Sequence, residues 1–417
     1  MKETYDLTII GAGPAGSTAA RIAAQKGLSV LVLEQKRVIG YPSHCAGGLL
    51  TLILDHMQLI PIVKDAIKAR IRKFQVHSPL MRSISHDFKR NIGYIVDRPT
   101  FDQLLCDEAS RNGADILTQA RAIGLKRDSK AFNQVLFKYK NETHNVRSRI
   151  IIGADGVASN VAKWTGISIP RKYLGIGYSY NAENLRNISS DTIEIYFLSA
   201  LPGGFAWIFP QGIDKANVGL GGYNSGTYMR KIFEWFKRKH RIASSKLSRV
   251  RLTDYTGGII PGSKIPSRTT FDYGMIVGDA ANQVDALTGE GIRLALICGE
   301  LAGQIAAFGI KKNDLSYIHN YHKLWRKRTF LELYLSRILR YLFLRFNSED
   351  FDIFVKAISR TNLNILFNKR RWIPLFLHSI LKTPSVLKPF RKIFQPLPQH
   401  VKVMSKSSDS FLSKNST

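Results

Sequence analysis

The sequence predicts an α/β protein, in which a doubly wound parallel sheet is joined by an antiparallel sheet and a helical C-terminal region. Two apolar runs, Leu7–Ile10 and Ser29–Glu34, flank a helix pattern over Gly13–Lys26. Together they form a strand–helix–strand unit with buried parallel strands. Short alternating runs over residues 171–260 are typical of antiparallel strands, and residues 316–400 are helical in pattern and contain no glycine.

A turn with three glycines, Gly11, Gly13 and Gly16, joins the first strand to its helix in the string GAGPAG. In such a turn the first glycine permits the tight bend, the second lets a pyrophosphate approach the backbone, and the third allows close packing of helix on strand. Free N–H groups and the positive end of the helix dipole hold the diphosphate. Glu34 ends the second strand, where a carboxylate suits the ribose hydroxyls of adenosine. These features predict a dinucleotide site.

A second motif lies far downstream, at Gly278–Ala281 (GDAA) and Gly289–Gly291 (GEG). Asp279 follows the apolar strand Tyr273–Val277, where it can accept a hydrogen bond from a ribityl hydroxyl. A helix predicted over Gly289–Phe308 directs its positive end at the flavin N1/C2=O edge, which carries negative charge in the reduced anion. The two motifs together predict FAD rather than NAD, bound by a glutathione-reductase-like domain.

The pattern divides the chain into four parts, and the FAD-binding domain is discontinuous because alternating runs separate its two motifs. The FAD-binding domain is expected over residues 1–75, 90–170 and 265–315, the antiparallel substrate domain over 76–89 and 171–264, the basic helical region over 316–404 and a disordered tail over 405–417.

The charge is strongly positive, with 61 Lys and Arg against 31 Asp and Glu and a net charge of +30. Such an excess indicates an anionic partner. Residues 321–417 hold 19 of the basic and 5 of the acidic residues, and basic residues among aromatic ones suit an anionic membrane interface. No stacking motif of RNA-binding domains is present, so nucleic acid is not the expected partner. The interleaved aromatic residues are Trp325, Phe330, Tyr334, Tyr341, Phe343, Phe346, Trp372, Phe376 and Phe390.

Three widely spaced cysteines, Cys45, Cys106 and Cys298, form no CxxC or Cys/His cluster. No metal site and no disulfide are therefore expected, and a reduced, cytoplasmic compartment fits best. The first strand begins close to the N-terminus and no apolar run is long enough to span a bilayer. We expect a peripheral protein on the inner face of the cell membrane.

The motifs together resemble the para-hydroxybenzoate hydroxylase-like flavoproteins, through GAGPAG, Glu34, RPTFDQLL at 98–105, GADG at 153–156 and GDAA…TGEG. Two segments are similar to the geranylgeranyl reductase family within that superfamily. HCAGGL at 44–49 resembles its cysteine-containing loop. PGGFAWIFP at 202–210, followed by VGLG, resembles its PxxYxWxFP…GxG signature with Phe205 in place of the tyrosine. The resemblance covers about residues 1–310.

That family reduces isolated double bonds in isoprenoid chains of archaeal ether lipids or chlorophyll precursors. The resemblance implies hydride transfer from reduced FAD to one alkene carbon. Cys45, or a water it orders, is the candidate acid for the other carbon. Further residues would contact FAD in addition to Gly11, Gly13 and Gly16. The implied FAD contacts are Ala15, Glu34, Cys45, Ala46, Gly48, Arg98, Ala122, Asp279, Gly291 and Ile292.

Phe205, Trp207 and Phe209 alternate along one predicted strand, so all three lie on one face. From the residues alone this is either a core face or the wall of an apolar tunnel, and the resemblance favours a tunnel that binds the isoprenoid lipid. A flavin monooxygenase, or a reductase of chlorophyll-type or free diphosphate isoprenoids, is the alternative function. The sequence leaves NADPH, ferredoxin and a deazaflavin open as electron donor.

Overall fold

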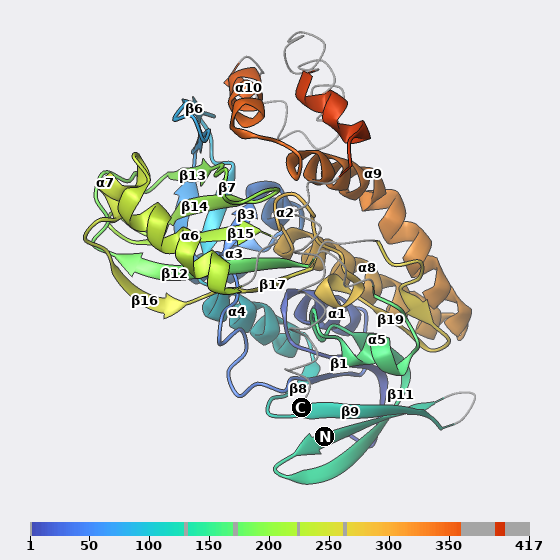
Figure 1. Cartoon of the computed structure of the whole chain (residues 1–417). Coiled ribbons are helices and arrows are strands. Elements are labelled where there is room, and N and C mark those ends of the chain that lie inside the picture. Colours follow the sequence, from blue (N-terminus) through green and yellow to red (C-terminus); the bar gives the residue numbers. More distant parts are fainter. Residues whose placement is uncertain are drawn as a thin grey trace.

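The computed structural model describes residues 2–128, 132–169, 174–222, 226–261, 265–359 and 388–396. One of its two large sheets has eight strands, and its parallel part brings together strands from three distant segments of the chain (Figure 1, lower part). The strands of the parallel part are, in spatial order, β8 (Ala114–Leu117), β2 (Val30–Leu33), β1 (Thr4–Ile10), β11 (Glu142–Gly153) and β19 (Gly274–Ile276). Because they are parallel, β1, β11 and β19 end at the same edge.

Both faces of this sheet are covered, which explains why β2 and the residues of β1 from Leu7 to Ile10 are buried on both sides. One face carries α1 (Pro14–Gln25), α4 (Arg98–Arg111) and α8 (Ile292–Lys311). The other face is closed by β9 (Arg121–Arg127) and β10 (Asn133–Tyr139), which continue antiparallel from β11. β18 (Thr270–Phe271) adds an antiparallel edge.

Helix α8 packs closely on α1 because glycines face the partner helix. A Cβ added at Gly299 would overlap the carbonyl oxygen of Ala15, and one at Gly303 would lie 2.6 Å from that of Ala19. Among the described residues, α8 is the one helix long and apolar enough to cross a membrane by length and composition, and 67% of its most apolar window is buried. Its packing on α1 and on the sheet identifies it as a core helix.

The second large sheet also has eight strands. Seven of them have the order β16-β12-β15-β14-β13-β5-β6, and β17 pairs with β12. Its strands are β5 (Lys73–His77), β6 (Ser83–Asp87), β12 (Gly175–Glu183), β13 (Thr192–Tyr196), β14 (Phe205–Pro210), β15 (Ala216–Gly222), β16 (Arg251–Tyr255) and β17 (Gly258–Ile260). The helices α6 (Gly226–Lys239) and α7 (Ala243–Leu247) lie over one face of this sheet, in front of it in Figure 1.

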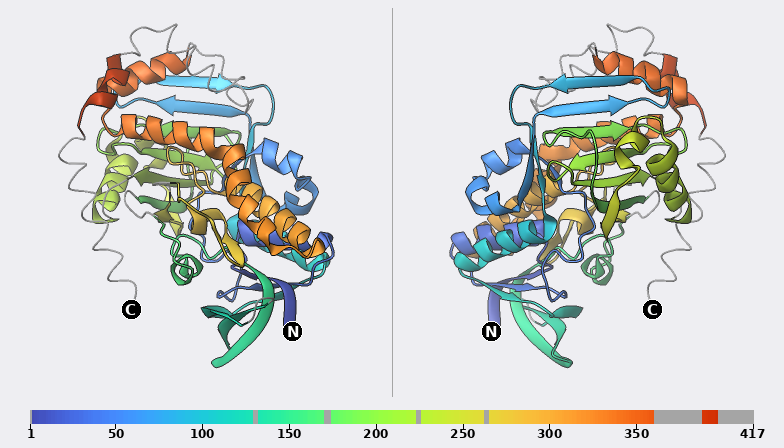
Figure 2. Two further views of the ribbon diagram at one scale, coloured as in Figure 1. Left: turned by 90° about the vertical axis from the view of Figure 1, so that its right-hand side faces the viewer. Right: turned by 90° about the vertical axis from the view of Figure 1, so that its left-hand side faces the viewer.

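The remaining elements connect the two sheets and extend the chain beyond α8. A third sheet has three strands in the order β3 (Gly48–Leu50), β7 (Gly93–Val96) and β4 (Ile67–Ile71). The short helices α2 (Thr51–His56) and α3 (Ile60–Val63) lie between β3 and β4 in the chain. The C-terminal part includes α9 (Asn320–Phe343) and α10 (Ser348–Ser359). Figure 2 shows α9 running along the outside of the molecule from the first sheet towards β5 and β6. The predicted tail at 405–417 lies outside the described residues.

The strand–helix–strand unit and the FAD-domain architecture are confirmed, with three corrections. The predicted helix at Gly289–Phe308 begins only at Ile292, because Gly289 adopts a left-handed φ of +72° in the loop before it. The excursion into the second sheet begins at Lys73 rather than residue 76. That sheet is not purely antiparallel, since β5 arrives from the first domain and pairs parallel to β13.

We expect Gly299→Val to destabilise the fold, because its side chain would occupy the space of the α1 backbone. Overpacking of this kind costs about 1–3 kcal/mol. Gly212→Val is the control, since a Cβ there meets only Lys215 at 3.8 Å. Thermal unfolding of the two variants should separate them, and equal melting temperatures would show that α1 and α8 are not held by this contact.

Candidate active site

The glycines of the first turn have distinct surroundings at the carboxyl edge of β1. A Cβ at Gly16 would overlap the carbonyl oxygen of Gly11, and one at Gly11 would overlap that of Ala154. Gly11 also has a φ of +104°, a conformation open mainly to glycine. A Cβ at Gly13 would meet nothing within 4 Å. Gly11 and Gly16 therefore close the turn, while Gly13, the N-cap of α1, faces open space where a diphosphate can reach the helix end.

Glu34 connects the end of β2 to this turn. Its two carboxylate oxygens accept hydrogen bonds from the N–H groups of Ala12 and Lys36, each at 2.8 Å. The side chain is nearly buried, at 8% exposure. The N–H of Ala120 donates to the Glu34 carbonyl, and Ala122 follows two residues later on β9. Two of the predicted FAD contacts, Glu34 and Ala122, thus lie on adjoining segments.

The loop with Cys45 meets Arg98 at the start of α4. Asp102 accepts two hydrogen bonds from the Arg98 guanidinium, from Nε at 3.0 Å and from Nη2 at 2.8 Å. Burial opposes the charge of Arg98, but Asp102 and Cys45 outweigh it and raise its pKa. Cys45 Sγ also accepts from the N–H of Gly47 at 3.4 Å. Arg98 therefore bonds Asp102 and interacts electrostatically with Cys45, and sequence reasoning foresaw neither partner.

Asp279 and the start of α8 close the same region from the other side. Burial raises the pKa of Asp279, and the charge of Arg98 opposes that rise. A Cβ at Gly291 would lie 3.3 Å from Asp279 Oδ1, which places the carboxylate at the N-cap of α8. Ile292 belongs to the apolar cluster against which Cys45 packs. Cys45, Arg98 and Asp279 are thus brought together from three distant segments.

The three cysteines differ in accessibility. Burial raises the pKa of both Cys106 and Cys298 to about 12, so their thiols stay protonated and unreactive. Cys45 is half-buried, on a loop beside Ala46 and Gly48. Of the three, Cys45 alone is accessible enough to exchange protons with a ligand.

The predicted aromatic face is confirmed as one face of β14. Neighbouring rings lie 6.0 Å apart for Phe205 and Trp207, and 5.9 Å apart for Trp207 and Phe209. A Cβ at Gly48 would lie 3.2 Å from the ring of Phe209, so this face abuts the cysteine loop. Phe205 and Leu287, which belongs to the GDAA…TGEG segment, pack against the same buried apolar cluster.

A buried polar network behind Trp207 was not predicted. Asn217, fully buried on β15, accepts a hydrogen bond from Trp207 Nε1 at 2.9 Å. Its amide donates to Thr256 at 2.8 Å and to Asn181 at 3.1 Å. The indole lies over Gly219 of the same strand, where a Cβ would meet it at 2.7 Å. The signal in the sequence is a lone asparagine on the same face as the glycines of an otherwise apolar strand.

The loop between Asp279 and α8 is held by side chains of its own and of α9. Asp285 Oδ1 accepts from the N–H groups of Leu287 and Thr288, at 3.0 and 2.9 Å, and from Ser336 Oγ at 2.7 Å. Arg293 is 2% exposed and forms ion pairs with Glu290, at 2.8 Å, and with Glu332 of α9.

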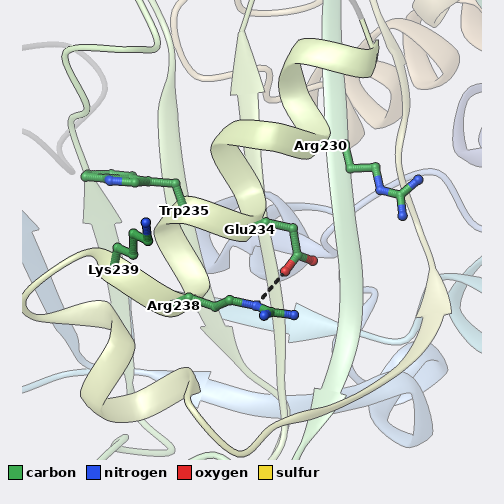
Figure 3. Close-up of a pocket in the computed structure, with 5 residues that line it drawn as sticks. All are labelled: Arg230, Glu234, Trp235, Arg238 and Lys239. Atoms are coloured by element: carbon green, nitrogen blue, oxygen red, sulfur yellow. Dashed lines mark hydrogen bonds and ion pairs between the residues drawn. The ribbon is translucent and has the colours of Figure 1, made fainter.

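Two further features need mention, one beside the glycine turn and one outside the site. Asp155 accepts hydrogen bonds from Ser159 Oγ at 2.6 Å and from the N–H of Asn160 at 2.7 Å, so it caps the short helix α5 (Asn160–Trp164). An open pocket of about 510 Å³ lies on the outside of α6 (Figure 3). Because α6 covers the face of the sheet opposite to Trp207, this pocket is not part of the site. Among the described residues, no cluster of His, Cys, Asp or Glu is suited to a metal ion.

Comparisons with known proteins agree with this geometry. Residues 4–297 match the family model described as an FAD binding domain. The digeranylgeranylglycerophospholipid reductase 1 of Methanococcoides burtonii is 32% identical over 418 residues, covering 94% of this chain and 100% of the relative. The digeranylgeranylglycerophospholipid reductase of Methanocaldococcus jannaschii is 31% identical, covering 94% and 99%.

The solved structures give the same assignment. A geranylgeranyl bacteriochlorophyll reductase-like protein of Thermoplasma acidophilum superimposes with a TM-score of 0.85 at 27% identity, over 94% of this chain and all of the other. The chondrochloren halogenase CndH, at 18% identity and a TM-score of 0.70, shares the fold alone. The sequence, the site and these relatives show that the chain belongs to the geranylgeranyl reductase family of FAD-binding oxidoreductases.

Proposed function

We propose that this protein reduces isolated C=C bonds in the geranylgeranyl chains of an ether phospholipid or its precursor. The relatives named as digeranylgeranylglycerophospholipid reductases support this substrate class. The observation that carries the proposal is the junction of the cysteine loop and the aromatic face. Phe209 lies against Gly48, three residues from Cys45. A proton donor and an apolar wall therefore adjoin the residues that fit FAD.

An isolated alkene has no carbonyl that the protein can polarise, so the site must act by positioning and by excluding water. FAD, when bound, supplies the hydride. Phe205, Trp207 and Phe209 hold the isoprenoid chain of the lipid. Asn217 fixes the ring of Trp207 by accepting the hydrogen bond from the indole N–H. Bound water would compete with the reaction, and the aromatic face excludes it.

Cys45 supplies the proton that balances the hydride. Its Sγ–H bond breaks, a C–H bond forms on the second alkene carbon, and a thiolate remains. The guanidinium of Arg98 and the N–H of Gly47 stabilise that thiolate. Cys45 is half-buried, so solvent can return the proton. We further propose a cytoplasmic, peripheral location on the inner face of the membrane, with NADPH, ferredoxin or a deazaflavin as electron donor.

Gly13→Val should fold normally and lose FAD. Its side chain has room in the protein alone, because a Cβ there meets nothing within 4 Å, but it takes the place of the diphosphate. The measurements are flavin absorbance of the purified protein and its melting temperature. Gly212→Val should remain yellow. A Gly13→Val protein that retains stoichiometric FAD would exclude this turn as the cofactor site.

Cys45→Ala should keep FAD and lose alkene reduction by on the order of a hundredfold, the usual contribution of a general acid. Cys298→Ala is the control, and should lower stability while leaving turnover per folded molecule intact. Single-turnover reduction of a geranylgeranyl lipid, followed by mass spectrometry across a range of pH, measures the effect. If Cys45→Ala turns over at the wild-type rate with an unchanged pH profile, Cys45 does not supply the proton.

Asn217→Leu should raise the KM for the lipid more than it lowers kcat, because Trp207 loses the bond that fixes its ring. The variant should also lose about 1–3 kcal/mol of stability, because Thr256 and Asn181 lose a buried partner. Thr192→Val, at a buried hydroxyl on β13, controls for loss of stability. A stability loss with unchanged kinetics would assign Trp207 to the core rather than to a tunnel.

A further inference from the structure

Helix α9 is fastened along its inner face to residues 282–291, the loop between the GDAA segment and α8, which we call the flavin loop. Tyr321 and Ser336 project from one side of the helix into that loop, and Glu332 on the same side pairs with Arg293 in the first turn of α8. Tyr321 Oη bonds the amide of Gln283 at 3.0 Å, and Gln283 Oε1 in turn accepts from the N–H of Gly278 at 2.7 Å. These contacts fix the orientation of α9 relative to the GDAA segment.

The outer face of α9 has the opposite character. It exposes large aliphatic and aromatic side chains, with exposures of 55% for Leu331, 49% for Tyr334 and 42% for Tyr341. Lys323 and Lys327 are exposed on the same side, since spacings of three and four residues place side chains on one face of a helix. Exposed apolar side chains that are interleaved with lysines suit an interface where headgroups meet hydrocarbon.

No acidic side chain opposes this charge on the helix itself. Glu332, the one acidic residue of α9, is turned inward to Arg293. Arg326 adds a further cation, 4.8 Å above the ring of Phe330, which stacks on Tyr334. The face therefore combines positive charge with exposed apolar area, and a complementary surface is negative and apolar at once.

The aromatic residues predicted for such a surface divide into two groups. Trp325, Phe343 and Phe346 are buried, at 0%, 3% and 8% exposure, because they pack into the core. Phe330, Tyr334 and Tyr341 are exposed. Phe390 is described, whereas Trp372 and Phe376 lie outside the described residues.

We propose that the outer face of α9 docks this protein on an anionic lipid bilayer. The inference deepens the proposed function, because the inner face of the same helix holds the flavin loop. Docking through α9 therefore sets the orientation of that loop relative to the lipid surface. The helix lies on the surface and does not span the bilayer, since its inner face is occupied by polar contacts.

The basic face of α6 provides a matched control. Arg230, Trp235 and Lys239 are exposed there; Figure 3 shows Lys239 near Trp235 and Arg230 on the other side of the helix. This face carries a similar charge. Helix α6 covers the face of the second sheet opposite to Trp207. Among the described residues, no hydrogen bond or ion pair given for α6 reaches the flavin loop. Lys323→Glu/Lys327→Glu and Arg230→Glu/Lys239→Glu change the net charge equally.

The experiment is co-sedimentation of the full-length holoprotein with phosphatidylglycerol vesicles and with phosphatidylcholine vesicles, at low and high salt. Wild type should bind phosphatidylglycerol and weaken with salt. Each lysine near such a surface is worth about fivefold in binding. The Lys323→Glu/Lys327→Glu variant should therefore bind at least about 25-fold less well, and the α6 variant should bind almost as wild type. Leu331→Ser/Tyr334→Ser should lose the part of the binding that resists salt.

FAD content and reduction of a detergent-dispersed geranylgeranyl lipid are measured on the same proteins. Both should be unchanged in the α9 variants, which separates docking from catalysis. The proposal is overturned if the α9 charge variant binds vesicles as wild type does, if the α6 variant loses as much, or if wild type binds single-stranded RNA and not phosphatidylglycerol. Vesicle binding without any alkene reduction would instead contradict the proposed function and leave the docking surface in place.

Discussion

The parallel pairing of β1 with β11 is the contact on which the rest of the site depends. Its register places Ile10 beside Gly153, and the next residues, Gly11 and Ala154, come so close that Gly11 has no room for a side chain. Glu34 reaches the same turn from β2 through the N–H of Ala12. On the other side β19 adds Asp279. A cofactor site built from three distant segments is therefore positioned by hydrogen bonds between strands.

The site combines two environments that ordinarily exclude each other. Arg98 and Asp102 form an ion pair that is largely removed from water, and such groups are tolerated only when they are paired. The aromatic face of β14 begins next to them and has no charge. The cysteine loop separates the two, with His44 bonded to the Gly257 carbonyl at 2.9 Å and Gly48 beneath Phe209. This loop is thus the boundary between the polar cofactor side and the apolar substrate side.

Much of the fold was predictable because its signals are local. A strand, a glycine turn and a helix adjoin in sequence, so Gly11, Gly13, Gly16 and Glu34 could be assigned from the residue pattern alone. The partners of Arg98 and Trp207 could not be assigned, because Asp102 and Asn217 are recognised only when packing brings donor and acceptor together. The sequence could not show which aromatic residues of α9 are exposed either, since Trp325 and Tyr334 belong to the same aromatic pattern but lie on opposite faces of the helix.

The discontinuity of the first sheet has a consequence for the order in which the protein can be completed. Strand β19 and helix α8 follow the whole second sheet in the chain, yet they pair with β11 and pack on α1. Synthesis proceeds from the N-terminus. The strands of the second sheet are therefore made before β19, Asp279 and α8. Loading of the flavin is consequently a late event, and an interrupted chain that ends before α8 presents the apolar face of α1 to the cell.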